Sequence, residues 1–312
     1  MSAAVFIDGA AGTTGLEIAE RLAGRSEFGL VSLDEARRKD RQARREALND
    51  ADFAILCLPD AAAREAVALI DPASRVRVID ASTAHRTAPG WIFGFPEVVG
   101  REAVAEAARV SNPGCYSTGF IALVAPLVRA GLLPADWPYT CHAVSGYSGG
   151  GKELIARFEG DPDIAWRGYA LALGHKHVPE MQAHCGLSLA PLFTPAVIPA
   201  HRGMVVEVPL PLAAMPGAAE PDALRLALAQ FYEGSRVVRM GEAPPDGELL
   251  MRRSREPSDA LELHLFAAPD GTQARLVAVL DNLGKGASGA AVQSLNLMAE
   301  LDETAGLRLP EN

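Results

Sequence analysis

Apolar and polar positions in the first third of the chain follow two alternating periods. Short apolar runs that fit buried strands lie at residues 5–7, 30–33, 52–58 and 75–79. Between them, apolar residues recur at helical spacing over 16–22 and 61–70. A loop at 94–97, a helix over 101–108 and a further strand follow. Strands that alternate with helices predict a Rossmann-type, doubly wound parallel sheet that binds ligands at the carboxyl ends of its strands.

The regular alternation of strand and helix patterns ends after a helical run at 120–128. Strand patterns follow at 139–144, 189–193, 205–210, 261–266 and 273–280. Asp270-Gly271 joins the last two strands as a hairpin, and helices are expected at 221–232 and 290–298. This half is typical of an α+β domain with a mixed or antiparallel sheet and helices on one face. We expect a first domain over 1–113, a second domain over 114–284, and a C-terminal helical segment, about 285–312, packed back on the first domain.

Composition narrows the classes of function. The chain has 312 residues, 49% of them hydrophobic, and a net charge of −10, which argues against nucleic acid as a partner. No apolar run approaches the roughly 20 residues of a membrane span. Residues 1–8 contain no basic n-region and no cleavable h-region, so we expect no export signal. The scattered cysteines form neither a disulfide framework nor a zinc pattern. We therefore expect a cytoplasmic protein.

A glycine-rich turn follows the first predicted strand and opens a helix. It runs from Gly9 through Gly12, Thr13 and Thr14 to Gly15. Glycines let a backbone approach a pyrophosphate, and a helix N-terminus stabilises its charge. The Gly-x-x-Gly-x-x-Gly spacing departs from the usual dinucleotide fingerprint, so a turn in some other α/β protein remains the alternative. Two further candidate cofactor contacts, at the ends of later strands, are Pro59 and Ser82.

Charged residues after the second predicted strand bear on the cofactor. Asp34-Glu35 is compatible with a ribose 2′-hydroxyl and therefore with NAD. The basic cluster Arg37-Arg38-Lys39 favours the 2′-phosphate of NADP, with Arg37 as the expected contact. An exposed charged helix is the alternative for any single residue here.

Cys115 lies in the stretch Ser111-Asn-Pro-Gly-Cys-Tyr-Ser-Thr-Gly119. Pro113-Gly114 predicts a tight turn, which would set the cysteine at the first turn of a helix. The unpaired N–H groups and the macrodipole of that helix start would favour the thiolate. A buried, inert cysteine is the alternative.

Two histidines follow a loop rich in glycine and serine. Residues 145–152 contain four glycines and two serines, and we expect a flexible loop there. If His175 to His177 is extended, both imidazoles lie on one face. The His-x-His spacing also suits a metal, but the sequence offers no third ligand set, so no metal site is expected.

These motifs together resemble one family over nearly the whole chain. The glycine turn, Asn112-Pro-Gly-Cys-Tyr116, Gly174-His-Lys-His-Val-Pro-Glu180, Pro199-Ala-His-Arg-Gly203 and the Asp281-Asn-Leu-Gly-Lys-Gly286 segment look like the N-acetyl-γ-glutamyl-phosphate reductases. That family belongs to the aspartate-semialdehyde dehydrogenase group, which has an NADP-binding Rossmann domain and an α/β dimerisation domain. The compact first domain resembles its shorter branch, so cofactor-ribose contacts do not transfer from the longer one.

The resemblance implies a reaction and a role in it for individual residues. Cys115 would attack the acyl phosphate to form a thioester, and NADPH would reduce it to N-acetylglutamate 5-semialdehyde, a step of arginine biosynthesis. His175 is the expected acid–base group, with His177 orienting it or binding substrate. Expected substrate contacts are Asn112, Arg86 and Arg202; Asn282 and Lys285 are expected near the nicotinamide. The alternative is a structural histidine for either imidazole, a surface charge for the arginines, and a turn-and-cap role for Asn282 and Lys285.

The sequence is also compatible with two other functions. A sister reductase that acts on aspartyl or aminoadipyl phosphate would share the motifs. A non-catalytic NADP-binding regulatory protein would keep the fold without the chemistry. We expect a homo-oligomer, either a dimer or a tetramer, that joins through the second sheet.

Overall fold

The computed structural model describes residues 2–244 and 246–310. The chain forms two compact units, residues 1–114 with 287–307, and residues 115–286 with 308–312. No helix in the described ranges is long and apolar enough to cross a membrane.

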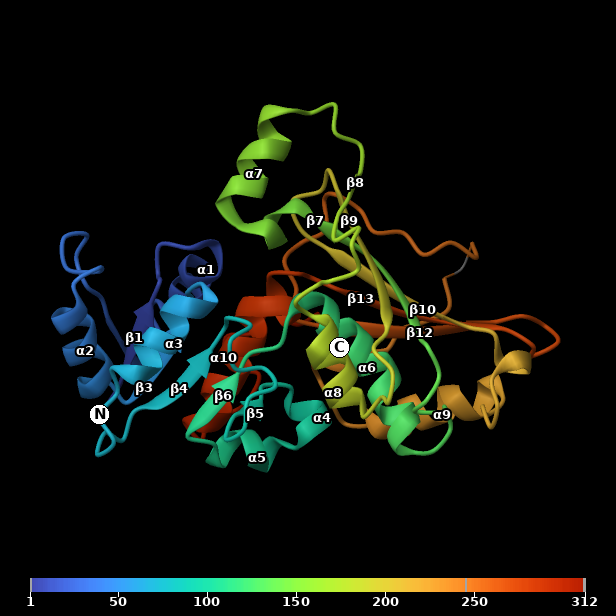
Figure 1. Ribbon diagram of the computed structural model, residues 1–312, viewed down its shortest axis with the longest axis horizontal. Coiled ribbons are helices and arrows are strands. Elements are labelled where there is room, and N and C mark those ends of the chain that lie inside the picture. The colour runs from blue at the N-terminus through green and yellow to red at the C-terminus, as the bar shows by residue number, and fades with distance from the viewer. Residues whose placement is uncertain (1, 245, 311–312) are drawn as a thin grey trace. The chain divides into compact units, whose positions relative to one another are not determined.

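The first unit contains a six-stranded sheet (Figure 1). Its strands are β1 (Ala3–Asp8), β2 (Phe28–Val31), β3 (Phe53–Leu56), β4 (Arg77–Asp80), β5 (Ile92–Phe93) and β6 (Arg109–Ser111). Their order is β2-β1-β3-β4-β6-β5, and every neighbouring pair is parallel. The predicted doubly wound parallel sheet is thus confirmed. The chain reverses direction across the sheet between β1 and β3, where such folds bind ligands.

Helices surround this sheet. They are α1 (Thr13–Leu22), α2 (Arg41–Asp50), α3 (Asp60–Ala68), α4 (Pro96–Val99), α5 (Arg101–Glu106) and α10 (Gly289–Met298). The expected loop at 94–97 is wrong in its second half, because Pro96 starts the short helix α4 and Glu97 lies in its first turn. Proline suits that position, since its fixed φ is helical and its missing N–H is not needed there.

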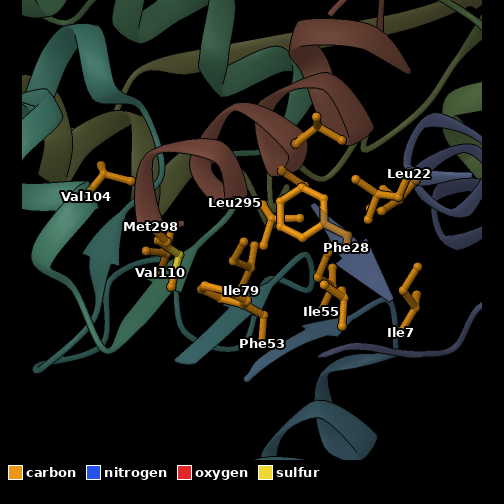
Figure 2. Packing of buried hydrophobic residues seen from close by; sticks show 14 of the residues in the cluster. Ile7, Leu22, Phe28, Phe53, Ile55, Ile79, Val104, Val110, Leu295 and Met298 are labelled. Atoms are coloured by element: carbon orange, nitrogen blue, oxygen red, sulfur yellow. The ribbon is translucent and has the colours of Figure 1, made fainter. Parts of the chain in front are cut away.

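Successive side chains of each strand point to opposite faces of the sheet, so the core of this unit has two layers. Val5, Ile55 and Ile79 belong to one hydrophobic cluster, which Leu295 and Met298 of α10 complete (Figure 2). Phe6, Ala54, Leu56 and Val78 point to the other face, where they pack with residues of α2 and α3. The period of two in each strand therefore fills both faces, as a parallel sheet requires. The late helix α10 is part of this core.

The second unit has a seven-stranded mixed sheet. Its strands are β7 (Thr140–Gly146), β8 (Arg167–Gly168), β9 (Leu192–Ile198), β10 (Met204–Leu210), β11 (Val238–Met240), β12 (Leu261–Ala267) and β13 (Ala274–Leu280). Their order is β11-β12-β13-β10-β7-β9-β8. The expected hairpin pairs β12 with β13, and two pairs, β7 with β9 and β11 with β12, are parallel. The expectation of a mixed sheet is confirmed.

Helix α6 (Cys115–Arg129) packs on β10, β12 and β13 and against two other helices, α8 (Val178–Cys185) and α9 (Pro221–Phe231). Pro126 lies inside α6 and cannot donate to the carbonyl of Ala122. The Tyr232 hydroxyl donates to that carbonyl at 2.9 Å, so the helix continues through the proline. A long helix on one face of the sheet thus carries Cys115 at its start.

The expected flexible loop at 145–152 is wrong. Its residues form the end of β7, the 3₁₀ turn η1 (Tyr147–Gly150) and the start of α7 (Gly151–Gly160). Asn282 ties this segment down, because its Nδ2 donates to the Ser148 hydroxyl at 2.9 Å. The remaining short helices are η2 (Leu212–Ala214) and the π-helical turn η3 (Gly284–Ser288).

Candidate functional site

Cys115 is the first residue of α6, as predicted from the Pro-Gly turn. Helix N–H groups without intrahelical partners and the positive end of the macrodipole meet at this position, and both favour a thiolate. Gly286 packs against it so closely that an added Cβ would lie 2.8 Å from the Cys115 Cβ. Only glycine at 286 therefore leaves room for the Cys115 Cβ at this position.

A cavity of about 460 Å³ opens beside Cys115. Glycines 146, 149 and 150 contribute to its wall, together with Tyr116, Tyr169 and His175. Its volume is in the range of small-molecule sites, and it combines apolar surface with convergent polar groups. All of its lining residues belong to the second unit.

Aromatic rings hold His175 in this cavity. Its ring lies 4.9 Å from that of Phe193, 5.6 Å from that of Tyr169 and 6.0 Å from that of Tyr116, centroid to centroid. The His177 ring lies 4.7 Å away and edge-on, but His177 is buried and does not line the cavity. The structure thus brings both predicted histidines together and exposes only His175 to a ligand.

The predicted extended conformation at 175–177 is wrong. His177 has helical backbone angles (φ −86°, ψ −14°) and caps α8. Because the chain turns there, the His177 backbone N–H donates to Nδ1 of His175 at 3.1 Å. The neutral imidazole therefore carries its proton on Nε2, which lies 3.4 Å from the Tyr169 hydroxyl.

The two tyrosines beside His175 stay protonated at neutral pH. Burial raises the pKa of Tyr169 to about 12. Burial also raises the pKa of Tyr116 well above its ordinary value, and its hydroxyl donates to the Ala196 carbonyl at 3.2 Å. Both phenols therefore supply hydrogen-bond donors and no negative charge.

The other cysteines differ from Cys115 in their surroundings. Burial raises the pKa of the Cys57 thiol to about 12, and the charges of Asp80 and Asp8 add to the effect. Burial likewise raises the pKa of Cys141 and Cys185, both of which are buried. Among these thiols only Cys115 combines partial exposure, a helix start and a cavity of the second unit.

A second cavity, of about 600 Å³, lies in the first unit at the β1/β3 switch point. Gly9, Gly12 and Pro59 line it, as the sequence predicts for cofactor contacts. An added Cβ on Gly9 would lie 2.3 Å from the Cys57 carbonyl oxygen, and one on Gly15 would lie 2.6 Å from that of Gly9. The turn is therefore built for glycine, and its backbone faces the cavity. Thr13 and Thr14 form the first turn of α1.

The basic cluster after β2 divides into two groups. Arg38 and Lys39 line the cavity together with Ser32 and Glu35. Arg37, the contact predicted from the sequence, is not among the lining residues and pairs with Glu46 at 3.6 Å. Arg38 itself pairs with Glu35 at 2.8 Å. These residues form a charged wall of the cavity, with two cations and one carboxylate.

A buried ion pair supports the glycine turn. Arg44 of α2 donates to Asp8, the last residue of β1, at 2.9 and 3.0 Å. Burial raises the pKa of Asp8, while the hydrogen bond and charge of Arg44 oppose that rise. The pair thus fixes the strand end just before Gly9.

Three predicted residues lie together elsewhere in the first unit. Ser82 donates to Asp80 through its backbone N–H and its hydroxyl, at 2.9 and 2.8 Å. Arg86 donates to the Asn112 carbonyl at 2.9 Å, and Asn112 donates through Nδ2 to the Ala287 carbonyl at 2.9 Å. Within the described residues, the buried Oδ1 of Asn112 has no hydrogen-bond partner. An unsatisfied buried acceptor is costly, which points to a donor on a bound molecule.

The three remaining predicted residues belong to the second unit and do not line the Cys115 cavity. Arg202 pairs with the buried Asp281 at 2.9 Å. Asn282 uses both ends of its amide inside the protein, since Gly203 N–H donates to its Oδ1 at 2.9 Å. Lys285 is buried within η3.

Sequence reasoning missed part of the cavity wall. Tyr116, Tyr169 and three cationic residues, Arg157, Arg167 and Lys176, line the Cys115 cavity. Tyr116 and Lys176 stand inside motifs that the sequence singles out. Arg157 and Arg167 give no such signal, because α7 reads as an ordinary charged helix and β8 has only two residues.

Family models match both units. Residues 4–107 match "Semialdehyde dehydrogenase, NAD binding domain", and residues 115–282 match "Semialdehyde dehydrogenase, dimerisation domain". The chain is 53% identical to N-acetyl-gamma-glutamyl-phosphate reductase 2 of Pseudomonas putida, with 94% of this chain and 96% of the relative covered. It is 51% identical to the reductase of Burkholderia ambifaria, with 94% and 95% covered. The chain belongs to the N-acetyl-γ-glutamyl-phosphate reductase family.

Solved structures agree on the fold of this family member. Aspartate semialdehyde dehydrogenase II of Vibrio cholerae matches with a TM-score of 0.68 at 17% identity, and covers 96% of this chain and 99% of its own. The aspartate semialdehyde dehydrogenase of Francisella tularensis matches with a TM-score of 0.69 at 11% identity, with 96% and 100% covered. Identities this low relate the folds alone.

Proposed function

We propose that this chain reduces N-acetyl-γ-glutamyl phosphate to N-acetylglutamate 5-semialdehyde and releases phosphate, in arginine biosynthesis. Relatives with the reductase name match it at 47–53% identity over nearly their full length. The observation that carries the chemistry is Cys115 at the start of α6, lining one cavity with His175. A thiol at a helix start beside an imidazole is the arrangement of an activated nucleophile.

The mechanism begins at the Cys115 sulfur. The thiolate attacks the γ-carbonyl carbon, and phosphate leaves with the electrons of the carbon–oxygen bond, which gives a thioester on Cys115. When bound, a nicotinamide dinucleotide supplies the hydride that reduces this thioester. The carbon–sulfur bond then breaks, the aldehyde leaves, and Cys115 is again a thiolate. The covalent thioester divides the reaction into two steps, and each has a lower barrier than a single direct step.

His175 handles the proton at Nε2 in this proposal. The His177 N–H bond to Nδ1 keeps the neutral ring protonated on Nε2. From there the ring donates a hydrogen bond to oxygen atoms that gain charge as the tetrahedral species form. The Tyr169 hydroxyl, 3.4 Å from Nε2, holds that nitrogen in place. His177 acts by orienting His175.

We propose NADP as the cofactor that the first unit prefers. The glycine turn supports a dinucleotide pyrophosphate, since it opens a helix and Gly9 and Gly12 line the cavity. Arg38 and Lys39 on the cavity wall support a 2′-phosphate, a role that the sequence gives to Arg37. The unpartnered Oδ1 of Asn112 supports a further contact to a bound donor.

We also propose a homo-oligomer that joins through the mixed sheet. The family model over 115–282 is described as a dimerisation domain. The helix α6 packs on one face of this sheet. On the other face, Val144 and Val205 are half-buried and lie opposite each other in the β7–β10 register. The free thiols of this chain support the expected cytoplasmic location.

One assay tests the proposed function against both rivals. Purified protein is mixed with phosphate, NADP⁺ and either N-acetylglutamate 5-semialdehyde or aspartate semialdehyde, and NADPH formation is followed. We expect phosphate-dependent turnover with the acetylated aldehyde and a far lower kcat/KM with the other. Preference for aspartate semialdehyde would establish a sister reductase. NADP(H) binding without turnover of any semialdehyde would establish a regulatory protein.

A further inference from the structure

Three cationic side chains line the Cys115 cavity. Arg157 comes from α7, Arg167 from β8, and Lys176 from the turn between the two histidines. Within residues 2–244 and 246–310, none of the three forms an ion pair, in contrast to Arg202 with Asp281 and Arg44 with Asp8. Cations without acidic partners around a nucleophile point to an anionic ligand.

The charge of this wall is opposite to that of the chain. Three cations and a single carboxylate, Glu153, give the lining residues a formal charge of +2 with His175 and the Cys115 thiol neutral, and +1 with the thiolate. The whole chain carries −10. A positive cavity in a negative protein concentrates anions locally and repels cations. Glu153 is four residues before Arg157 on α7, so the two side chains share one helix face.

Arg167 is held without an ion pair. Its guanidinium lies over the Tyr169 ring, 4.5 Å from the ring centroid. Stacking fixes the plane of the guanidinium and leaves its N–H edge available for a bidentate carboxylate. Tyr169 also contacts His175, so one aromatic ring links the cation to the reacting end of the cavity.

This wall separates two substrates that share a carboxylate and an acyl phosphate. A free amino-acid phosphate carries an α-ammonium, whereas the N-acetylated one carries a neutral amide. An ammonium among three cations is repelled, and only Glu153 could balance it. The amide brings no charge, and its methyl group suits the apolar part of the wall formed by Leu154 and Val197.

We propose that Arg157, Arg167 and Lys176 form an anion subsite that binds the α-carboxylate of the substrate and rejects substrates with a free α-ammonium. The inference rests on the proposed function and names how that site chooses its substrate. Arg167 contributes most, because its guanidinium is already oriented. Arg157 and Lys176 are more exposed and add mainly to the local potential.

The test compares Arg167→Gln, Arg157→Gln, their double variant and Arg167→Lys with the wild type in the phosphate-dependent assay. Loss of a charge-assisted pair costs about 1.5–3 kcal/mol, so Arg167→Gln should raise KM for N-acetylglutamate 5-semialdehyde roughly 10- to 100-fold. We expect kcat to change less than KM. Arg167→Lys should recover only part of the loss, because lysine cannot form the bidentate pair.

The same variants test whether the three cations cause the preference for the acetylated substrate. The ratio of kcat/KM for the acetylated aldehyde to that for aspartate semialdehyde should fall in the double variant. Arg253→Gln, an exposed arginine outside the cavity, is the matched control and should keep the wild-type ratio. Thermal unfolding of each variant, with calorimetric titration of N-acetyl-L-glutamate, separates lost binding from lost folding.

Two results would overturn the inference, and each differs from failure of the proposed function. Unchanged KM and ratio in a folded double variant would exclude the subsite. A fall in kcat at constant KM would assign these arginines to the chemical step instead. A wild type inactive with N-acetylglutamate 5-semialdehyde would instead refute the proposed function itself.

Discussion

The two cavities of this protein are built in different ways. The cavity of the first unit is lined by one continuous stretch, residues 6–12, and by residues that follow β2 and β3. The Cys115 cavity is lined by one to three residues from each of α6, β7, α7, β8, β9 and the turn before α8. Backbone recognition needs glycines at fixed positions, whereas side-chain recognition needs several elements to meet. Changes in the second cavity should therefore affect chemistry, and changes in the first should affect stability and cofactor choice.

The largest effect is expected for Cys115→Ser in the second cavity. Loss of the nucleophile should lower kcat by about 10⁴-fold or more, because the thioester cannot form at a comparable rate. Turnover of the semialdehyde is the measurement. Cys185→Ala, which changes a buried thiol of the same unit outside the cavity, should remain active. Full activity of Cys115→Ser would refute the covalent mechanism.

Two variants, His175→Gln and His175→Ala, distinguish hydrogen-bond donation from proton transfer at Nε2. Both should lower kcat by roughly 10²- to 10⁴-fold, the range for a general acid–base group. Glutamine can still donate a hydrogen bond from its amide but has no titratable proton. If it retains much more activity than alanine, hydrogen-bond donation is the main role; equal losses indicate proton transfer. Pre-steady-state measurement of phosphate release separates acylation from later steps, and wild-type kcat in both variants would exclude His175.

Arg44→Gln tests the support of the first cavity. It leaves Asp8 buried without its cation, so the free energy of unfolding should fall by about 3–5 kcal/mol at pH 8. The control Arg45→Gln removes an exposed pair with Asp71, which solvent screens, and should change stability far less. Chemical unfolding of both variants gives the comparison, and equal losses would contradict it.

The Arg44→Gln loss should shrink as pH falls. Burial raises the folded-state pKa of Asp8 above its unfolded value, and removal of Arg44 takes away the interactions that oppose this rise. Between the unfolded and folded pKa values the folded state binds more protons, so stability decreases as pH rises through that window. The variant should therefore be closer to the wild type near pH 5 than at pH 8. A loss independent of pH would assign the effect to packing.

Arg38→Gln probes cofactor choice and has the smallest expected effect. KM for NADP should rise about 10-fold, the cost of one charge-assisted bond, while KM for NAD should change little. Arg37→Gln provides the comparison with the contact expected from the sequence. A larger effect for Arg37 would restore that expectation. Equal changes for both cofactors would exclude a contact to the 2′-phosphate.

Patterns formed by residues close together in the sequence predicted the fold well. The parallel sheet, the mixed sheet and the β12–β13 hairpin follow from short-range periodicity and turn residues. The errors lie where long-range contacts override local preference. Residues 145–152 read as a flexible loop, yet the distant Asn282 fixes them through Ser148. Residues 175–177 read as extended, yet the start of α8 turns them.

By itself, the sequence determined the position of Cys115 at a helix start, the glycine turn and the family, because each depends on neighbouring residues. Only the tertiary structure decided which cations have acidic partners. Arg202 pairs with Asp281 far along the chain, while Arg157 and Arg167 remain available in the cavity wall. Charge pairing depends on distances between side chains that the fold brings together, so no local pattern reveals it. The same reason explains the proton on Nε2 of His175, which a turn of the backbone assigns.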